Sequence, residues 1–319
     1  MEIKKRVVSS IVKMMKEDKS NIFYLFYYSV IEAILVLSIP LASSFIINSV
    51  LAHASISVLV LGGVVASIFV LTTIIQIVKE YIIEKFQQKI FIKTGIYVAS
   101  MATQLKQSTQ ETKDTIDKYM NYFFDISAIQ KFFPILLLDG TGLIVKILVS
   151  LLLLLAFDPM LFALGLFFFI LFMLLLAMMG HKGVEYAVER SDAKHNAIYY
   201  LQNIPEQNEA SEKILEEFDN YLDTFVTARE RIFRVIIRQL TLMFFMEGLI
   251  FSGFLIMGGY LVINGTLPIG EFVAAEIVVV SVIYALKGFM KQIDYIYDMI
   301  EGFYKVDKLS LSLDENKDV

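Results

Sequence analysis

Apolar residues occur along this chain in long blocks rather than at the short period of a soluble helix or strand. Six blocks are almost entirely apolar, and they cover residues 22–47, 55–78, 132–157, 160–179, 240–263 and 269–286. A helix needs about 20 residues to cross the hydrocarbon core of a bilayer. The pattern therefore predicts an all-α membrane protein with six transmembrane helices.

The connections between these blocks fall into two kinds. Residues 48–54, Asp158-Pro159 and residues 264–268 are short enough for tight turns only. Residues 79–131 and 180–238 are long, charged and poor in Gly and Pro. We expect each to form two helices that leave the membrane, turn near residues 107–113 or 202–208, and return. About 25 helical residues each way would project on the order of 35 Å.

The two ends of the chain lie outside these blocks. Residues 1–20 alternate apolar and basic positions at helical spacing, which suits a helix lying on a membrane surface. A solvated, frayed terminus is the alternative. We expect an amphipathic elbow over residues 1–20, a six-helix domain over 21–309 and a tail over 310–319.

Composition agrees with a membrane protein and excludes several other classes. Hydrophobic residues make up 57% of the 319 residues and charged residues 19%, whereas a soluble chain is about half apolar and a quarter charged. The net charge of −5 and the lack of a basic block give no support to nucleic-acid binding. Without cysteine there is no disulfide or thiolate site. The three histidines lie in separate segments, so we propose no metal site and no catalytic group.

The Lys and Arg residues predict the orientation of the helices. The three short connections contain none, and nearly all 28 lie in the terminal segments and the two long excursions. Loops rich in Lys and Arg stay in the cytoplasm. We therefore expect both termini and both excursions to be cytoplasmic.

Short motifs in the second half of the chain carry a family resemblance. They are Arg238-Gln239, Gly258–Val262, Gly265, Gly270–Glu276 and Tyr295–Tyr297, preceded upstream by Asn121–Lys131, Leu136–Gly140 and Ala156–Pro159. In this order they resemble the transmembrane domain of an ATP-binding-cassette (ABC) exporter. The chain is most similar to the bacterial branch of peptide, bacteriocin and type I secretion exporters. The resemblance implies the type 1 exporter fold and a bacterial cytoplasmic (inner) membrane.

In such exporters the tips of the excursions bind the ATPase domains. The resemblance assigns this coupling role to two tips, Ser108, Thr109, Gln110, Glu111 and Thr112 in the first and Asn203, Ile204, Pro205, Glu206 and Gln207 in the second. It implies alternating access driven by ATP, with two transmembrane subunits, identical or different, around one pathway. The alternative for the tips is a simple homodimer contact. The cargo would be a peptide or protein, a lipid or another amphiphile.

The chain departs from many relatives because no ATPase motif follows its sixth helix. A phosphate-binding loop needs the spacing Gly-x-x-x-x-Gly-Lys-Ser/Thr, which occurs nowhere. Gly140–Lys146 has glycines and a lysine but lies in an apolar block with the wrong spacing. We expect no cofactor on this chain, with ATP and Mg²⁺ bound by a partner ATPase that is a separate subunit or was removed from the chain.

Five charged residues fall within or beside the apolar blocks: Glu32, Asp139, Lys146, Glu247 and Glu276. Charges at membrane depth are costly and usually face a partner or a cavity. We expect Lys146 to pair with Glu276 or Glu247. A lining role in the substrate pathway and a proton relay are the alternatives. The relay defines a rival function, an ion-coupled secondary transporter, which would not explain the long excursions; a scaffold or receptor would not explain the charges.

Overall fold

The computed structural model describes residues 19–53, 58–107 and 134–302, and these residues are helical with short turns and no strand. Its elements are α2 (Lys19–Leu51), α3 (Val58–Gln107), the π-helix η2 (Pro134–Gly140), α6 (Thr141–Phe157), α7 (Pro159–Met179), α8 (Gly183–Asn203), the 3₁₀ turn η3 (Ile204–Glu206), α9 (Ser211–Ile263) and α10 (Ile269–Met290). A further helix covers residues 293–302. Among the described residues, six helices are long and apolar enough to span a membrane, which confirms the predicted number of spans.

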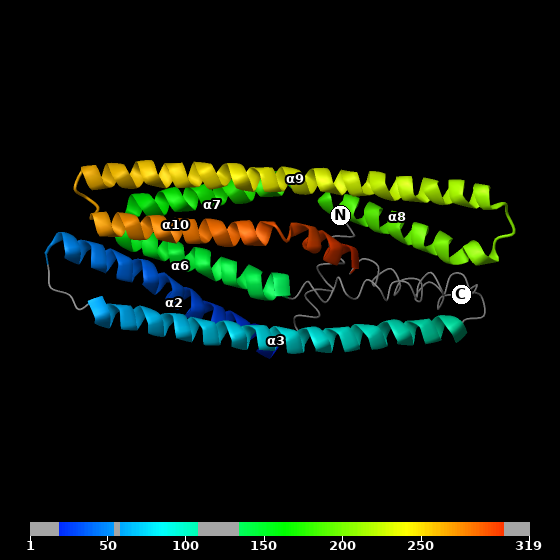
Figure 1. Ribbon diagram of the computed structural model, residues 1–319, viewed down its shortest axis with the longest axis horizontal. Coiled ribbons are helices and arrows are strands. Elements are labelled where there is room, and N and C mark those ends of the chain that lie inside the picture. Colours follow the sequence, from blue (N-terminus) through cyan, green and yellow to red (C-terminus); the bar gives the residue numbers. More distant parts are fainter. Residues whose placement is uncertain (1–18, 54–57, 108–133, 303–319) are drawn as a thin grey trace.

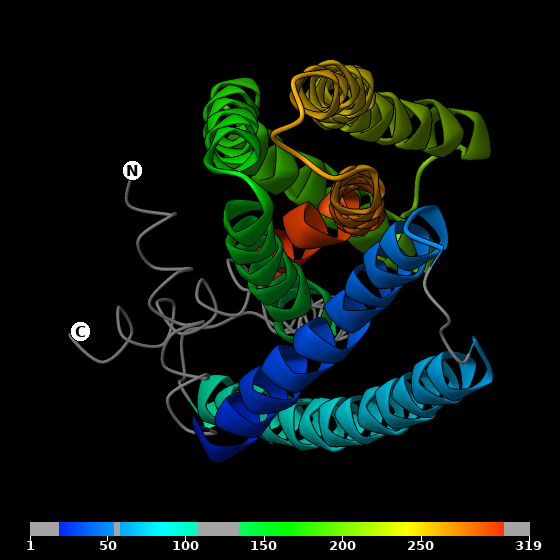
Figure 2. The same ribbon diagram turned by 90° about the vertical axis from the view of Figure 1, so that its left-hand side faces the viewer.

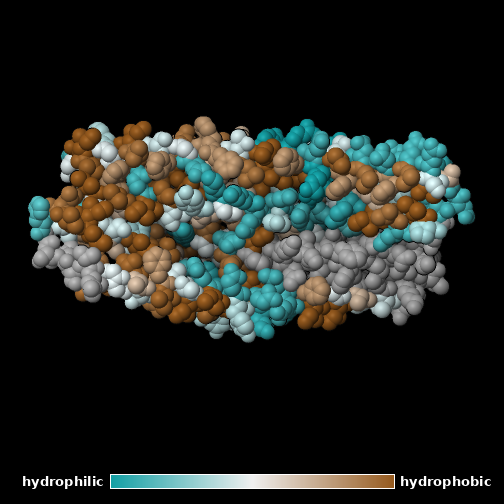
Figure 3. All heavy atoms as spheres, in the orientation of Figure 1, coloured by the Kyte–Doolittle hydropathy of each residue, from teal (hydrophilic) through white to brown (hydrophobic). Residues whose placement is uncertain are grey.

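The molecule is a long bundle whose two ends differ (Figure 1). At one end, here the loop end, α2 ends and α3 begins, α6 turns into α7, and α9 turns into α10. At the opposite end, here the tip end, α3 ends and α8 turns into α9. Hydrophobic residues gather toward the loop end, and hydrophilic ones gather over α8 and α9 toward the tip end (Figure 3). The arrangement confirms that three tight connections share one end.

The two longest helices extend well beyond a membrane thickness. The 53 residues of α9 measure about 80 Å and the 50 residues of α3 about 75 Å at 1.5 Å per residue. The apolar block 240–263 fills a bilayer, so residues 211–239 of α9 project roughly 40 Å beyond it. The second expected excursion is thus confirmed as a helical hairpin of α8 and α9. The first tip, together with residues 1–18 and 303–319, lies outside the described residues.

The short connections form where the sequence carries the matching turn residues. Asp158 caps α7, because its side chain accepts a hydrogen bond from the Met160 amide at 2.7 Å and Pro159 occupies the first helical position. Gly265 ends α9 with a left-handed φ of 73°, a conformation that glycine adopts without steric cost. Both turns lie where the apolar blocks end.

The buried side chains form two clusters. The larger one joins α6, α7, α9 and α10 around residues such as Phe172, Met243 and Phe254. The smaller one joins α2, α3, η2 and the helix over 293–302 around Leu25, Phe86 and other residues. Seen from the loop end, α10 lies at the centre, with α2 between it and α3 (Figure 2). The seam between the two clusters is where a polar pocket forms.

Candidate functional site

The pocket lies between α2 and α3 on one side and η2, α6 and α10 on the other. Its volume is about 670 Å³, which is within the usual range for small-molecule sites. Its polar lining comes from α2, α3, η2, α6 and the turn after α10, and its polar side chains are Ser29, Glu32, Thr73, Gln76, Lys79, Glu80, Asp139, Lys146 and Gln292. Three of the five charged residues singled out in the sequence therefore share one pocket, although they come from three different helices.

Glu32 is held on one wall by two neighbours from α3. The Lys79 ammonium lies 2.7 Å from Glu32 Oε2, and the Gln76 amide donates to Glu32 Oε1 at 2.9 Å. The Lys79 side chain is only 5% exposed, so this ion pair is well shielded from water. A methyl group added at Gly142 of α6 would lie 3.8 Å from Lys79 Nζ. The pair therefore joins α2 to α3 and lies close to α6.

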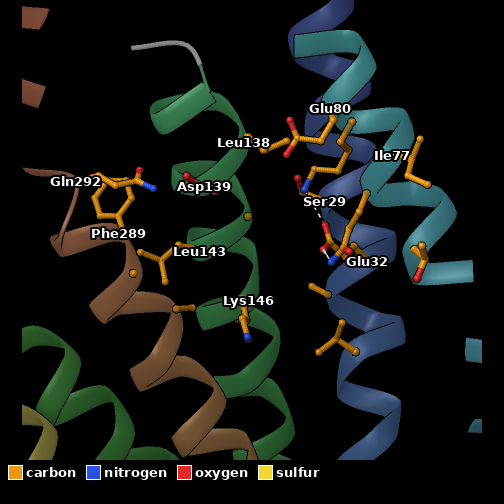
Figure 4. A pocket seen from close by; sticks show the side chains of 18 residues that line it. Ser29, Glu32, Ile77, Glu80, Leu138, Asp139, Leu143, Lys146, Phe289 and Gln292 are labelled. Carbon is orange, nitrogen blue, oxygen red and sulfur yellow. Dashed lines mark hydrogen bonds and ion pairs between the residues drawn. The ribbon is translucent and has the colours of Figure 1, made fainter. Parts of the chain in front are cut away.

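Lys146 lies on the opposite wall, on α6, and within the described residues it forms no hydrogen bond or ion pair. It lies 11 residues from the end of α6 at Phe157, which is about 17 Å along the helix and near the middle of a bilayer. Figure 4 shows Lys146 toward one end of the pocket, with Asp139, Glu80 and Gln292 toward the other. The pocket thus carries an ammonium group at its deep end.

The pairing expected for Lys146 is wrong. Glu247 pairs instead with Lys287, whose ammonium lies 2.8 and 3.1 Å from the two carboxylate oxygens. α9 and α10 form a hairpin, and Glu247 precedes its turn by about as many residues as Lys287 follows it, so the two lie level. Lys146 faces α2 across the pocket rather than α9, and no described ion pair joins it to Glu276 either.

Glu276 lies on α10, half-buried and away from the pocket lining. Its Oε2 atom is buried and has no hydrogen-bond partner among the described residues. The five charged residues therefore separate into two that are paired, two that line the pocket without a described partner, and Glu276 outside it. Sequence position alone could not separate these groups.

The second tip has the turn that the sequence predicts. α8 ends at Asn203, the 3₁₀ turn η3 contains Ile204 and Pro205, and the Gln207 amide donates to the Ile204 carbonyl at 3.1 Å. Tyr200 fastens the hairpin one turn earlier, since its hydroxyl donates to Glu217 at 3.1 Å and its ring lies 4.9 Å from that of Tyr221. The tip is therefore held in a defined shape at the far end of a stiff helix pair.

A network of ion pairs around the buried Arg190 connects this hairpin to the helix that follows α10, and the sequence analysis did not predict it. Arg190 of α8 contacts Asp294, Asp298 and Glu301 of the helix over 293–302. Burial lowers the pKa of its guanidinium, but the carboxylates of Asp298, Glu301 and Asp294 outweigh burial and raise that pKa above its usual value. The spacing of the three acids, four and three residues apart, places them on one helix face and was the signal available in the sequence.

Within the described residues, no group of three or more His, Asp or Glu side chains is arranged to hold a metal ion. No protein-family model matches this chain, and no curated protein is similar to it.

Proposed function

We propose that this chain is the transmembrane permease subunit of an ABC exporter, which moves its substrate out of the cytoplasm by alternating access. ATP and Mg²⁺ would be bound by a separate ATPase subunit. The observation that carries the proposal is the α8–α9 hairpin, which projects roughly 40 Å beyond the apolar block and ends in a compact turn. A membrane protein without a partner at this distance has no evident use for such a hairpin.

The tip is built for contact with a rigid partner. Asn203–Gln207 lie at the extreme end of the molecule (Figure 1), and the ring stacking and hydrogen bonds of Tyr200 hold the turn between α8 and α9. A force applied to such a turn moves both helices together instead of unfolding the loop. We propose that the ATPase binds this turn, and by resemblance also the first tip.

The Arg190 network offers a route from the tip to the pocket. α8 belongs to the hairpin, and the helix over 293–302 continues the direction of the chain from α10, which lines the pocket through Ala285 and Phe289. Motion of α8 therefore pulls on α10 through three ion pairs. In the proposed cycle this couples ATP-driven movement of the tip to the wall of the pocket.

A second transmembrane subunit is supported by an exposed apolar face on α9. Outside the membrane block, Leu215, Leu222, Val226, Phe233 and Ile237 follow one another at spacings of seven and four residues, which places them on a single helix face, and all are at least 40% exposed. Lipid cannot cover these positions if they project from the bilayer.

The same face continues into the membrane block through Phe244, Phe251 and Leu255, which are also exposed. A partner that covers the whole face must therefore lie both inside and outside the bilayer. A soluble protein cannot do so, and a second six-helix subunit with its own projecting helices can. We propose that such a subunit packs along α9 and completes the pathway.

The first experiment is purification of the tagged chain from native membranes in mild detergent, with identification of bound proteins by mass spectrometry. A stoichiometric ATPase with a phosphate-binding loop supports the proposal, and its absence under conditions that preserve other membrane complexes refutes it. A photo-crosslinking residue at Val226 should then attach a second transmembrane chain. The matched control is Thr224, which is exposed on the opposite side of α9 and should attach none.

The coupling role of the tip has its own test. Replacing Ile204-Pro205-Glu206 by Gly-Ser-Gly should abolish transport while leaving the complex folded and its basal ATP hydrolysis intact. Replacing exposed Glu212, in the first turn of α9, by Ala is the control and should change neither quantity. Normal transport by the tip variant would exclude the coupling role.

The alternative function is an ion-coupled secondary transporter, and one observation favours it. Glu276 Oε2 is buried without a hydrogen-bond partner among the described residues, as expected for a carboxyl that exchanges protons. If no ATPase is bound, Glu276→Gln should abolish transport driven by a proton gradient. Transport by the variant at the wild-type rate would exclude this alternative.

A further inference from the structure

We propose that the pocket between α2, α3, η2, α6 and α10 binds a dipolar ligand, with an anionic group at Lys146 and a primary ammonium group at Asp139, Glu80 and Gln292. The ligand chemistry is a carboxylate or phosphate joined through an apolar linker to an amine. The identification of this ligand as the exported cargo rests on the proposed function. Its binding in the pocket does not depend on that function.

The charge balance of the pocket leaves a specific set of groups for a ligand. Glu32 and Lys79 neutralise each other at 2.7 Å, and Gln76 occupies the other oxygen of Glu32. Lys146, Asp139 and Glu80 also line the pocket, and none of them forms a hydrogen bond or ion pair with another described residue. One cation and two anions are therefore available to a bound molecule.

Lys146, at the deep end of the pocket, is suited to bind an anionic group of a ligand. An ammonium group near the middle of a bilayer is stable when it faces a counter-charge or a polar cavity. The nearest acid across the pocket, Glu32, is already paired with Lys79. A carboxylate or phosphate that enters the pocket would form a charge-assisted hydrogen bond with Lys146, which is stronger than a hydrogen bond between neutral groups.

The other end of the pocket offers oxygen acceptors from two helices and one turn. Asp139 comes from η2, Glu80 from α3, and Gln292 follows α10. Gln292 Oε1 is buried and has no hydrogen-bond partner among the described side chains and backbone. A primary ammonium has three N–H donors and no acceptor, so it matches this set. Figure 4 shows these three residues toward the end opposite Lys146.

The spacing of the two ends sets the length of the ligand. Asp139 and Lys146 are seven residues apart along η2 and α6, which corresponds to roughly 10 Å. An extended tripeptide spans about the same distance, at 3.3–3.6 Å per residue. Between the two ends, Leu143 and Phe289 supply apolar wall on one side, and the mutually neutralised Glu32–Lys79 pair lies on the other. A short apolar linker with opposite charges at its two ends therefore fits the pocket.

The test uses four forms of one tripeptide, Leu-Phe-Leu: with free termini, N-acetylated, C-amidated, and blocked at both ends. Dissociation constants are measured by calorimetry for the full chain in phosphatidylcholine nanodiscs. The form with free termini should bind most tightly, and blocking either end should weaken binding about tenfold, as expected for the loss of one charge-assisted hydrogen bond. Lysophosphatidylethanolamine is the control for a lipid headgroup, because its phosphate and primary ammonium are joined by only two carbons and cannot span the roughly 10 Å between the two ends of the pocket.

Variants then assign each end. Lys146→Gln should weaken binding of the free and N-acetylated peptides about tenfold and leave the C-amidated peptide unchanged, and Lys146→Arg should retain binding. Asp139→Asn should weaken the free and C-amidated forms instead. Lys287→Gln is the control, because Lys287 pairs with Glu247 outside the pocket and its loss should change none of these constants.

The possible results of these binding measurements distinguish the proposal from its alternatives. Binding of the lysolipid but of no peptide would overturn the two-ended site, since the charges of the lysolipid are too close together to reach both ends. Equal binding of all four peptides, binding of neither probe class, or no effect of Lys146→Gln on any anionic probe would overturn the proposal. Because the assay contains no ATPase, failure of the exporter proposal would leave these results unchanged.

Discussion

Removing the Arg190 guanidinium should destabilise the protein more than removing any one of its exposed partners. The Arg190 side chain is 10% exposed and that of Glu301 is 5% exposed, so both charges are almost fully withdrawn from water. Removing one partner of a buried ion pair costs about 3–5 kcal/mol, because the other charge stays buried without compensation. Lys194 still reaches Glu301 at 3.1 Å, and we therefore expect about 3 kcal/mol for Arg190→Met.

The partners of Arg190 provide an internal scale for this prediction. Asp294 is 49% exposed and its oxygen lies 3.3 Å from Arg190. Exposed ion pairs contribute about 0–1 kcal/mol, so Asp294→Asn should cost less than about 1 kcal/mol. Removing Arg190 and Glu301 together, as Arg190→Met with Glu301→Leu, should cost less than Arg190→Met alone, since no buried charge is then left unpaired.

The assay is thermal unfolding of the full chain in detergent, followed by far-ultraviolet circular dichroism. At about 2 °C per kcal/mol for a chain of this size, Arg190→Met should lower Tm by roughly 6 °C and Asp294→Asn by no more than about 2 °C. Equal shifts for the two variants would refute the assignment of the network as a buried connection between α8 and the end of α10. A double variant less stable than Arg190→Met would refute the role of the unpaired charge.

Three further substitutions test other parts of the structure by the same Tm measurement. Lys79→Met should cost about 3 kcal/mol because it leaves Glu32 without its cation, and adding Glu32→Gln should recover part of that loss; no recovery would contradict the pairing. Gly183→Ala should cost about 1–3 kcal/mol, since the new methyl group would overlap the Tyr297 ring; wild-type Tm would show that the ring moves aside freely. Asp158→Ala should cost about 1 kcal/mol through loss of the α7 cap, whereas Asp158→Asn should keep most of it.

The spans and the short turns could be predicted from the sequence because each depends on local chemistry. The length of an apolar block determines whether it crosses a bilayer, and residues such as Pro159 and Gly265 mark where helices begin and end. The α8–α9 turn was predicted for the same reason, from the polar segment around Pro205. Local signals did not reveal that η2 is a π-helix, because nothing in Pro134–Gly140 distinguishes it from an ordinary helical turn.

The ion pairs could not be predicted equally well, because they depend on which helices are neighbours. The apolar blocks of the sequence include Glu247 and Lys146, which were therefore recognised as charges at membrane depth. Lys287 lies just beyond the end of a block and was not recognised. Hairpin geometry alone would have placed Lys287 beside Glu247, since both lie at similar distances from the turn between α9 and α10. Lys79 was missed for the same reason, as the first residue after a block.

The ion pairs formed by Lys287 and Lys79 change the role that Lys146 can have. Treated as a structural charge, it requires an acid within the protein, and the two acids proposed for it lie elsewhere. Once Lys287 neutralises Glu247 and Lys79 neutralises Glu32, Lys146 faces a pocket in which the remaining described acids lie at the opposite end. Glu32, already paired with Lys79, is the acid whose charge acts on Lys146, but no described acid forms an ion pair with Lys146 itself. A cation without its own ion pair, at a depth where charge is costly, is best explained by a counter-charge that arrives with a ligand.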